Sequence, residues 1–369
     1  MAVRARDLGI RLDGRPGPLN ALTDVPGVEV GTVTLVDGDT VRTGVTAVLP
    51  RGRDGIGVAC AGGWYALNGN GEMTGTAWLD EVGAVAVPVL VTSTHSVGAC
   101  HTGTIEWVAR NRPELAEQWV LPVVAETWDG YLNDVSGGHV RPEHAVAAID
   151  GARGGPMDEG SVGGGTGMVC YGFKGGTGTA SRLVDHAGTS YTVGVLLQAN
   201  FGSRAELVVA GVPVGRELPE DNAYETEPWL GGVGSCIAVV VTDAPLLPGQ
   251  CAALARRVPL GLARTGTTGS HFSGDLFLAL STANEGALTS VIPRTATAGP
   301  DAYESMRFVP WGWLDPFFTA VVEATEEAVL NVLVDNADMT GRDGHRVPAL
   351  PHDRLRELLG AGHARGTAS

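Results

Sequence analysis

The stretch "GGVGSCIAVVVTDAPL", residues 231–246, passes from a glycine run into an apolar run, and Ser235 stands where the two meet. The apolar run is rich in β-branched side chains, which predicts a buried strand over 236–242. Glycines permit backbone geometries that other residues avoid, as a self-cleaving bond would need. If the Gly234–Ser235 bond is cut, Ser235 gains a free α-amine of pKa about 7.7–8.0, so one residue can supply both nucleophile and base. On these residues alone, a turn before a core strand is the alternative.

On both sides of this stretch the hydrophobic pattern predicts strands and helices in alternation. Expected strands lie at 28–50 around an Asp-Gly turn, 83–93, 119–126, 166–174, 177–184, 190–199 and 275–281. Expected helices lie at 103–118, after Pro142, at 248–263 and at 315–335. This layout fits stacked α and β layers. Residues 212–234 are polar and rich in Pro, Glu and Gly, and long exposed loops of this kind are where chain cutting concentrates.

The composition predicts a globular enzyme with a large core. The chain has 369 residues, of which 44% are hydrophobic and 18% are charged. A formal net charge of −16 argues against nucleic acid and anionic membrane surfaces as partners. No apolar run reaches the roughly 18 residues that a membrane span needs. The N-terminal "MAVRARDLGIRLDGRPG" lacks the apolar core of a signal peptide.

The cysteines favour free thiols in a reducing cytoplasm, because their number is odd and their spacing wide. They are Cys60, Cys100, Cys170, Cys236 and Cys251. Cys236 adjoins Ser235, but neighbouring residues of a strand face opposite ways, so its thiol is expected in the core.

Other motifs point to different chemistries without completing them. The glycine-rich stretch 163–182 lacks the spacing of a nucleotide-binding loop, since Lys174 is followed by Gly175 instead of Ser or Thr. The histidine pairs lack the spacing of a zinc site, so no metal is expected. "THSVG", residues 94–98, comes close to a nucleophile elbow, which keeps Ser96 as an alternative nucleophile.

Motifs along nearly the whole chain resemble those of the DmpA family, which comprises L-aminopeptidase/D-esterases and β-peptidyl aminopeptidases. They are "GNGEMTG" (69–75), "STHSVG" (93–98), "ETWDGYLND" (126–134), "SVGGGTGM" (161–168), "LLQANFG" (196–202), "GSCIAVVVTDAPLLPGQ" (234–250), "GLARTG" (261–266), "SGDLFLALSTAN" (273–284) and "TGRDGHRVPALPHD" (340–353). The resemblance implies an α+β fold, a four-layer αββα sandwich, in a single domain over residues 1–369. It also implies self-cleavage before Ser235 into fragments 1–234 and 235–369.

The resemblance further implies a hydrolase of small peptides or amino-acid amides that works without a cofactor or metal. Members of the family are usually assemblies of four αβ pairs, so a homo-oligomer of cleaved chains is expected. Ser235 is implied as the nucleophile, with its own amine as base. Asn200 matches the asparagine that stabilises the oxyanion, and Ser273 with Asp275 matches a pair that orients the nucleophile and its amine. Several members carry Glu where this chain has Asp275, which is one methylene shorter.

The substrate side of the site is implied by "ETWDGYLND". Glu126 matches the acid that receives the free amino group of the substrate. Trp128 stands where the family often has Tyr, so a hydroxyl role there is lost or passes to Tyr131. Glu72 in "GNGEMTG" is a second acid near the expected pocket.

Two other functions fit parts of the pattern. An acyltransferase of the ornithine acetyltransferase type would pass its acyl group to an amine instead of water, but those enzymes use Thr in a different local motif. A non-enzymatic binding protein could keep the same fold. The joint presence of Ser235, Asn200 and Ser273 argues against it.

Overall fold

Two β-sheets form the middle of the protein, whose structure is a computed structural model. It describes residues 3–225, 227, 230, 233–292, 297–299 and 302–366, with side chains as far as residue 361. Gly231 and Gly232 of the predicted glycine run lie outside the described residues. Among the described residues, no helix is long and apolar enough to cross a membrane.

The six-stranded sheet carries the strand that begins at the glycine–serine junction. Its order is β4 (Ala84–Val85), β3 (Cys60–Ala66), β12 (Ser273–Ser281), β11 (Gly234–Thr242), β10 (Thr189–Asn200) and β9 (Gly176–His186). The central strand β11 runs antiparallel to β10 and parallel to β12. The four-stranded sheet has the order β1 (Glu29–Asp37), β2 (Val41–Leu49), β5 (Val89–Ser93) and β6 (Val123–Thr127).

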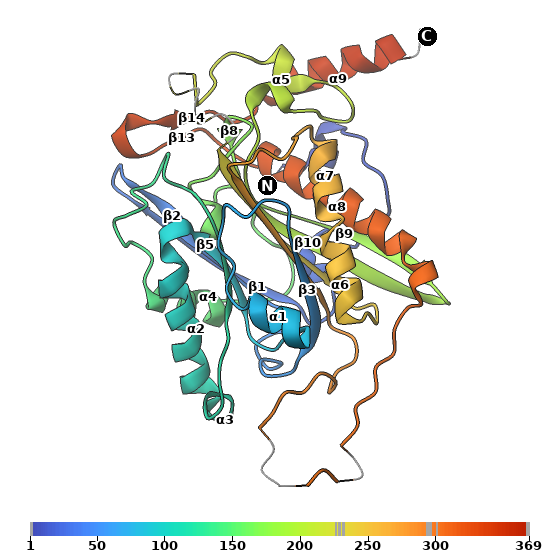
Figure 1. Cartoon of the computed structure of the whole chain (residues 1–369). Coiled ribbons are helices and arrows are strands. Elements are labelled where there is room, and N and C mark those ends of the chain that lie inside the picture. The colour runs from blue at the N-terminus through green and yellow to red at the C-terminus, as the bar shows by residue number, and fades with distance from the viewer. Residues whose placement is uncertain are drawn as a thin grey trace.

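Helices cover the outer faces of both sheets (Figure 1). The four-stranded sheet is covered by α2 (Val97–Asn111) and α4 (Pro142–Asp150), and the six-stranded sheet by α6 (Pro248–Ala255), α7 (Val258–Arg264) and α8 (Asp315–Val334). Shorter or peripheral elements are α1 (Thr76–Val82), α3 (Pro113–Ala116), α5 (Val214–Glu217), α9 (His352–Gly366), β7 (Val169–Cys170), β8 (Phe173–Lys174), β13 (Met339–Thr340) and β14 (Arg346–Val347). The four-layer αββα sandwich is therefore confirmed.

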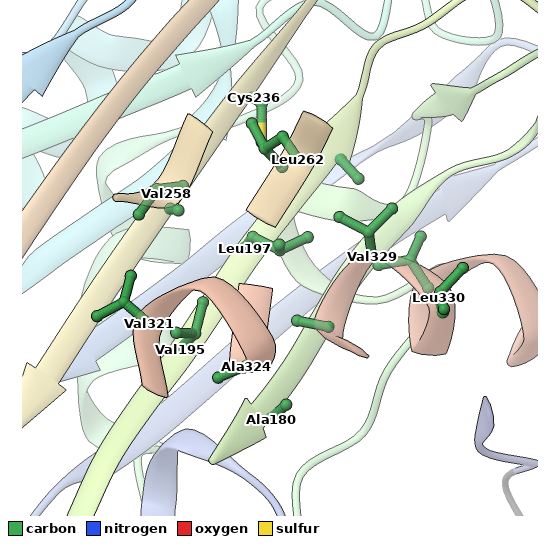
Figure 2. Close-up of a cluster of buried hydrophobic side chains, with 14 of the residues drawn as sticks. Ala180, Val195, Leu197, Cys236, Val258, Leu262, Val321, Ala324, Val329 and Leu330 are labelled. Atoms are coloured by element: carbon green, nitrogen blue, oxygen red, sulfur yellow. The ribbon is translucent and has the colours of Figure 1, made fainter. Parts of the chain in front are cut away.

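Alternation along the central strand divides its side chains between two cores. Ile237, Val239 and Val241 of β11 pack into the core between the sheets. Cys236, Ala238 and Val240 face the other way, into the core beneath α7 and α8 (Figure 2). Cys236 is fully buried and burial raises its pKa well above the ordinary value, so it is the core thiol that its position predicts.

Four predicted elements are divided in the structure by local breaks. The helix expected at 103–118 begins earlier, at Val97, and is divided at Pro113 into α2 and α3. Residues 83–93 form two strands, β4 and β5, in different sheets, with Pro88 in the crossing. The strand expected at 166–174 is the short hairpin β7–β8, since Tyr171 and Gly172 both adopt positive φ. The helix expected at 248–263 is divided into α6 and α7, because Pro259 cannot donate the hydrogen bond that would continue α6.

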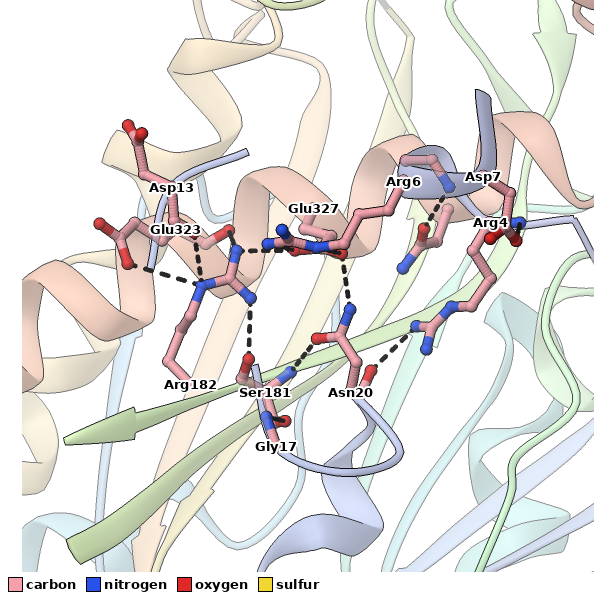
Figure 3. Close-up of polar contacts among 12 residues, drawn as sticks. Arg4, Arg6, Asp7, Asp13, Gly17, Asn20, Ser181, Arg182, Glu323 and Glu327 are labelled. Atoms are coloured by element: carbon pink, nitrogen blue, oxygen red, sulfur yellow. Dashed lines mark hydrogen bonds and ion pairs between the residues drawn. The ribbon is translucent and has the colours of Figure 1, made fainter. Parts of the chain in front are cut away.

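A buried polar cluster, formed by Arg6, Asn20, Arg182 and Glu327, anchors the N-terminal segment to α8 on the outer side of the six-stranded sheet (Figure 3). Arg182 of β9 donates to Glu327 of α8 at 2.7 Å, and both side chains are almost fully buried. Arg6 pairs with the same carboxylate at 2.8 Å, and Asn20 donates to it at 2.6 Å. Glu327 of α8 therefore holds together the N-terminal segment and β9, which are distant from it in the sequence.

Candidate active site

Ser235 lies at the start of β11 with its hydroxyl on the side of the core between the sheets. It is the second residue of the strand, it is 2% exposed, and it shares a face with Ile237. Its Oγ accepts a hydrogen bond from the backbone N–H of Trp128 at 3.0 Å and another from Asn200 Nδ2 at 3.3 Å. Two donors therefore converge on the oxygen that the sequence predicts to be the nucleophile.

Asn200 is brought to Ser235 by the register of the sheet. It ends β10, directly opposite Ser235 of β11. Its Oδ1 accepts the backbone N–H of Val169 at 2.9 Å, and its Nδ2 also donates to the Trp128 carbonyl at 2.8 Å. These contacts fix which end of the amide faces Ser235. An N–H held in this way can stabilise negative charge on a reacting oxygen, where loss of one donor typically costs about 2.7–4 kcal/mol.

Gly234 has no room for a side chain. A Cβ there would lie 2.2 Å from the carbonyl oxygen of Asn200 and 3.0 Å from Cα of Phe201. Its own N–H donates to the Phe272 carbonyl at 3.3 Å. The glycine before Ser235 is thus required by close backbone contact within the sheet, and the chain runs through this point as continuous strand.

Ser273 and Asp275 lie on β12, beside the backbone of β11. Ser273 Oγ donates to Asp275 Oδ1 at 2.7 Å, so the shorter aspartate does reach its partner serine. Their strand positions pair with Gly234 and Cys236, on either side of the nucleophile. Burial raises the pKa of Asp275, against hydrogen bonds from Ser273, Asn68 and the Cys236 backbone. The pair faces the main chain around Ser235, where a new α-amine would form.

Glu126 lies at the end of β6 in the facing sheet. Its Oε1 accepts the backbone N–H of Glu72 at 2.9 Å, and its Oε2 accepts the hydroxyl of Thr94. Burial raises the pKa of Glu126, and the nearby charge of Glu72 adds to this effect. A Cβ on Gly71 would lie 3.3 Å both from Glu126 Oε1 and from Gly274 Cα. Gly71 therefore lies between the carboxylate and β12, at the residue of β12 that pairs with Ser235.

Trp128 and Tyr131 occupy different surroundings. Trp128 acts on Ser235 through its backbone, while its indole is half-buried. The Tyr131 hydroxyl donates to the Ala223 carbonyl, and its ring stacks on His345 at 4.3 Å between centroids. The phenol is therefore engaged with the segment upstream of Ser235. Its ring belongs to one hydrophobic cluster with Val169, against which Trp128 and Val233 pack.

Several groups at the site were not singled out from the sequence. Asn68 Nδ2 donates to Asp275 Oδ2 at 3.1 Å, and Thr94 holds Glu126. Thr94 belongs to the same motif, "THSVG", as Ser96. The backbone N–H of Trp128 carries no signal in the sequence. Among the described residues, no three His, Cys, Asp or Glu side chains are grouped to hold a metal.

Comparison with known proteins gives consistent matches over almost the whole chain. A sequence model of peptidase family S58 matches residues 20–347. The β-peptidyl aminopeptidase BapA of Sphingosinicella microcystinivorans is 48% identical, over 96% of this chain and 91% of that protein. BapA of Sphingosinicella xenopeptidilytica is 44% identical, over 97% and 91%. The L-aminopeptidase D-Ala-esterase/amidase of Ochrobactrum anthropi, described as a prototype serine aminopeptidase and a variant of the Ntn hydrolase fold, superposes with a TM-score of 0.90 at 41% identity, over 98% and 99% of the two chains.

Proposed function

The chain belongs to peptidase family S58 and is an N-terminal-nucleophile aminopeptidase, and on that premise we propose that Ser235 is the nucleophile, exposed when the protein cuts its own Gly234–Ser235 bond. The observation that carries the proposal is the pair of N–H donors, from Trp128 and Asn200, on Ser235 Oγ. The family and the relatives give no support to the acyltransferase alternative.

Self-cleavage uses the groups already beside the bond. Ser235 Oγ attacks the carbonyl carbon of Gly234, and the C–N bond breaks as an ester forms and the Ser235 nitrogen takes up a proton. Water then hydrolyses the ester, which leaves a carboxylate on Gly234 and a free amine on Ser235. In the uncut chain Ser235 is 2% exposed and Glu126 is 3% exposed. We propose that cutting also opens the site to a substrate.

Turnover repeats this chemistry on an external amide. The α-amine of Ser235 takes the hydroxyl proton as Oγ attacks the substrate carbonyl, and returns it to the departing amine. Asn200 and the Trp128 N–H stabilise the oxyanion of the tetrahedral intermediate. Ser273 and Asp275 orient the amine, since they flank the backbone of residues 234–236. Water releases the acyl group from Ser235.

Glu126 selects substrates with a free amino group. A carboxylate 3% exposed is well placed to pair with an ammonium that has left water. Glu72 adds negative charge beside it, since it influences the pKa of Glu126. We propose β-amino-acyl amides as substrates, because the two BapA relatives are β-peptidyl aminopeptidases. Trp128 borders this region, while Tyr131 contributes by holding the segment near Ala223.

Intact-mass analysis tests the cleavage directly. Purified protein is expected as fragments 1–234 and 235–369, and Ser235→Ala is expected to stay whole and inactive. Ser281→Ala is the matched control, because Ser281 is a buried serine of the same sheet that donates to the Ala244 carbonyl, away from the site. Full-length mass in fully active enzyme would exclude Ser235 as an N-terminal nucleophile. Turnover of p-nitroanilides bearing β-, L- and D-amino-acyl groups then ranks the substrates.

We further propose that cleaved chains associate into an oligomer in the cytoplasm. Between β12 and α8, the described residues 282–292 and 302–310 extend away from the sheets (Figure 1). Three aromatic side chains before α8 are exposed: Tyr303 at 92%, Trp311 at 53% and Trp313 at 64%. Five free, buried thiols favour a reducing compartment. Light scattering on wild type and on a Trp311→Ser/Trp313→Ser variant tests the association, and a wild-type monomer would exclude it.

A further inference from the structure

A buried lysine lies behind Asn200, in the glycine-rich stretch that is not a nucleotide-binding loop. Lys174 ends β8 and has no exposed surface. Its Nζ donates to the main-chain carbonyls of Met168 at 2.9 Å and Gly175 at 2.8 Å. No carboxylate of the described residues faces this ammonium, and Cys170 is the titratable neighbour that acts on it. A buried cation without a counter-ion is costly to the fold, so its presence needs a reason.

The peptide group that receives this ammonium also holds Asn200. The Met168 carbonyl accepts from Lys174, and the N–H of the same peptide group, on Val169, donates to Asn200 Oδ1 at 2.9 Å. Asn200 Nδ2 in turn points at Ser235 Oγ at 3.3 Å. Ammonium, peptide group, side-chain amide and nucleophile therefore form one continuous chain of hydrogen bonds, with every donor directed toward Ser235.

Glycine makes this chain of contacts possible. A Cβ on Gly175 would lie 2.4 Å from the Ala199 carbonyl oxygen and 2.9 Å from the Cys170 nitrogen. The absence of a side chain lets the Lys174 segment pack against the end of β10, where Asn200 lies. The glycine-rich stretch thus brings a positive charge close behind the site without exposing it to water.

Hydrogen bonds in such a chain polarise one another, and the effect is greatest where water is excluded. A positive charge at one end makes each successive N–H a better donor, so the last N–H binds an oxyanion more strongly. We infer that Lys174 is a positioning residue for the reaction at Ser235, whose buried charge orients and polarises Asn200 through the peptide group between Met168 and Val169. The inference rests on the proposed function, in which Asn200 binds the oxyanion. Burial lowers the pKa of Lys174 to about 7, while negative charge forming at Ser235 favours the protonated amine.

A double-mutant cycle tests the inference on the processed enzyme. Lys174→Met removes the charge and keeps the length, Lys174→Gln keeps a neutral donor, and Asn200→Ala removes the end of the chain. Arg204→Met is the matched control, because Arg204 is a buried cation whose hydrogen bonds also go to main-chain carbonyls, including those of Tyr171 and Gly172. The measurements are kcat, KM, the rate of self-cleavage and the thermal midpoint.

Both Lys174 substitutions are expected to lower kcat about tenfold with KM unchanged, since a weakened donor costs less than the 10²–10³ of a missing one. In the Asn200→Ala background, Lys174→Met should cost almost nothing further, and Arg204→Met should change the thermal midpoint but not kcat. Unchanged kcat, a loss of equal size in the Asn200→Ala background, or failure of both Lys174 variants to fold would each overturn the inference. Asn200→Ala at wild-type kcat would instead contradict the proposed role of Asn200.

Discussion

Two buried polar clusters differ in how their charges are compensated: one lies on the outer side of the six-stranded sheet, and the other lies around Ser235, with groups from both sheets. Where the N-terminal segment meets α8, Arg182 and Arg6 share the carboxylate of Glu327 (Figure 3). Burial by itself would raise the pKa of Glu327, but the two guanidinium groups lower it below its ordinary value. Glu323 also pairs with Arg182, at 3.5 Å, so two guanidinium groups face two carboxylates and the charge is balanced there.

Around Ser235 the charges are left unbalanced. Burial raises the pKa of Glu126 and of Asp275. Asp129, which follows β6 and accepts hydrogen bonds from Ser93 and Asn133, is fully buried, and burial raises its pKa to about 6. Within the described part of the chain, none of these carboxylates forms an ion pair, and Lys174 is held by carbonyls alone. The cluster around Glu327 therefore stabilises the fold, whereas the groups around Ser235 are held ready to bind charge that a substrate or a transition state brings.

The largest effect is expected on the free energy of unfolding, when the balanced cluster around Glu327 loses its shared carboxylate. Glu327→Gln leaves Arg182 and Arg6 without their shared carboxylate, which should lower the free energy of unfolding by about 3–5 kcal/mol. Because the cluster does not contact Ser235, kcat of the processed enzyme should not change. Urea unfolding and steady-state kinetics on the same preparation test both parts, and a fall in kcat would join the two clusters functionally.

The next largest effect is expected on kcat, when Asn200 is replaced and a second buried asparagine, Asn331, serves as the control. Asn200→Ala should lower kcat by about 10²–10³, as for one lost oxyanion donor. Asn331 of α8 is the matched control, because its side chain also makes two buried hydrogen bonds, with the Ala5 N–H and the Thr179 carbonyl. Asn331→Ala should cost similar stability without a loss of kcat. Equal kcat in the two variants would remove the distinction between the clusters.

The unbalanced charge of Asp129 should appear as a dependence of stability on pH. Its folded pKa of about 6 lies above the ordinary value of 3.8, so the folded state holds the proton more tightly. The resulting stability is fully present below about pH 4 and is lost as pH rises through 6, by about 3 kcal/mol at most. Asp129→Asn should lack this decline. Unfolding curves of wild type and variant that stay parallel from pH 4 to 7 would contradict the assignment.

The smallest effect concerns substrate binding. Glu126→Gln should lower kcat/KM for free-amine substrates roughly 10- to 100-fold, mainly through KM, because a hydrogen bond to a charged group contributes about 1.5–3 kcal/mol. Since burial raises the pKa of Glu126, the wild type should lose affinity at mildly acidic pH as the carboxylate is protonated. Glu72→Gln is the control, with a weaker effect expected. Equal kcat/KM in wild type and Glu126→Gln would exclude Glu126 as the anchor for the ammonium.

The sequence predicted the elements that local pattern controls. Alternation over 236–242 predicted a strand with Cys236 in the core, and the motif "LLQANFG" predicted Asn200 at a strand end, as the structure has them. Some predicted elements are divided by single residues such as Pro259, which removes one backbone donor without changing the hydrophobic pattern. The strand β3 and the helices α1 and α9 were not predicted.

Residue types in a fixed order were enough to identify the family, the αββα layering and the side chains proposed for catalysis. Which groups contact one another depends instead on how distant segments pack. Asn68 reaches Asp275 across 207 residues of sequence. The donors on Ser235 and Asn200 from residues 128 and 169 are backbone N–H groups, which every residue other than proline carries. A backbone N–H group acquires a particular role only when the fold places it within hydrogen-bond distance of one atom. The pattern of side chains in the sequence therefore could not predict which N–H groups lie at the site.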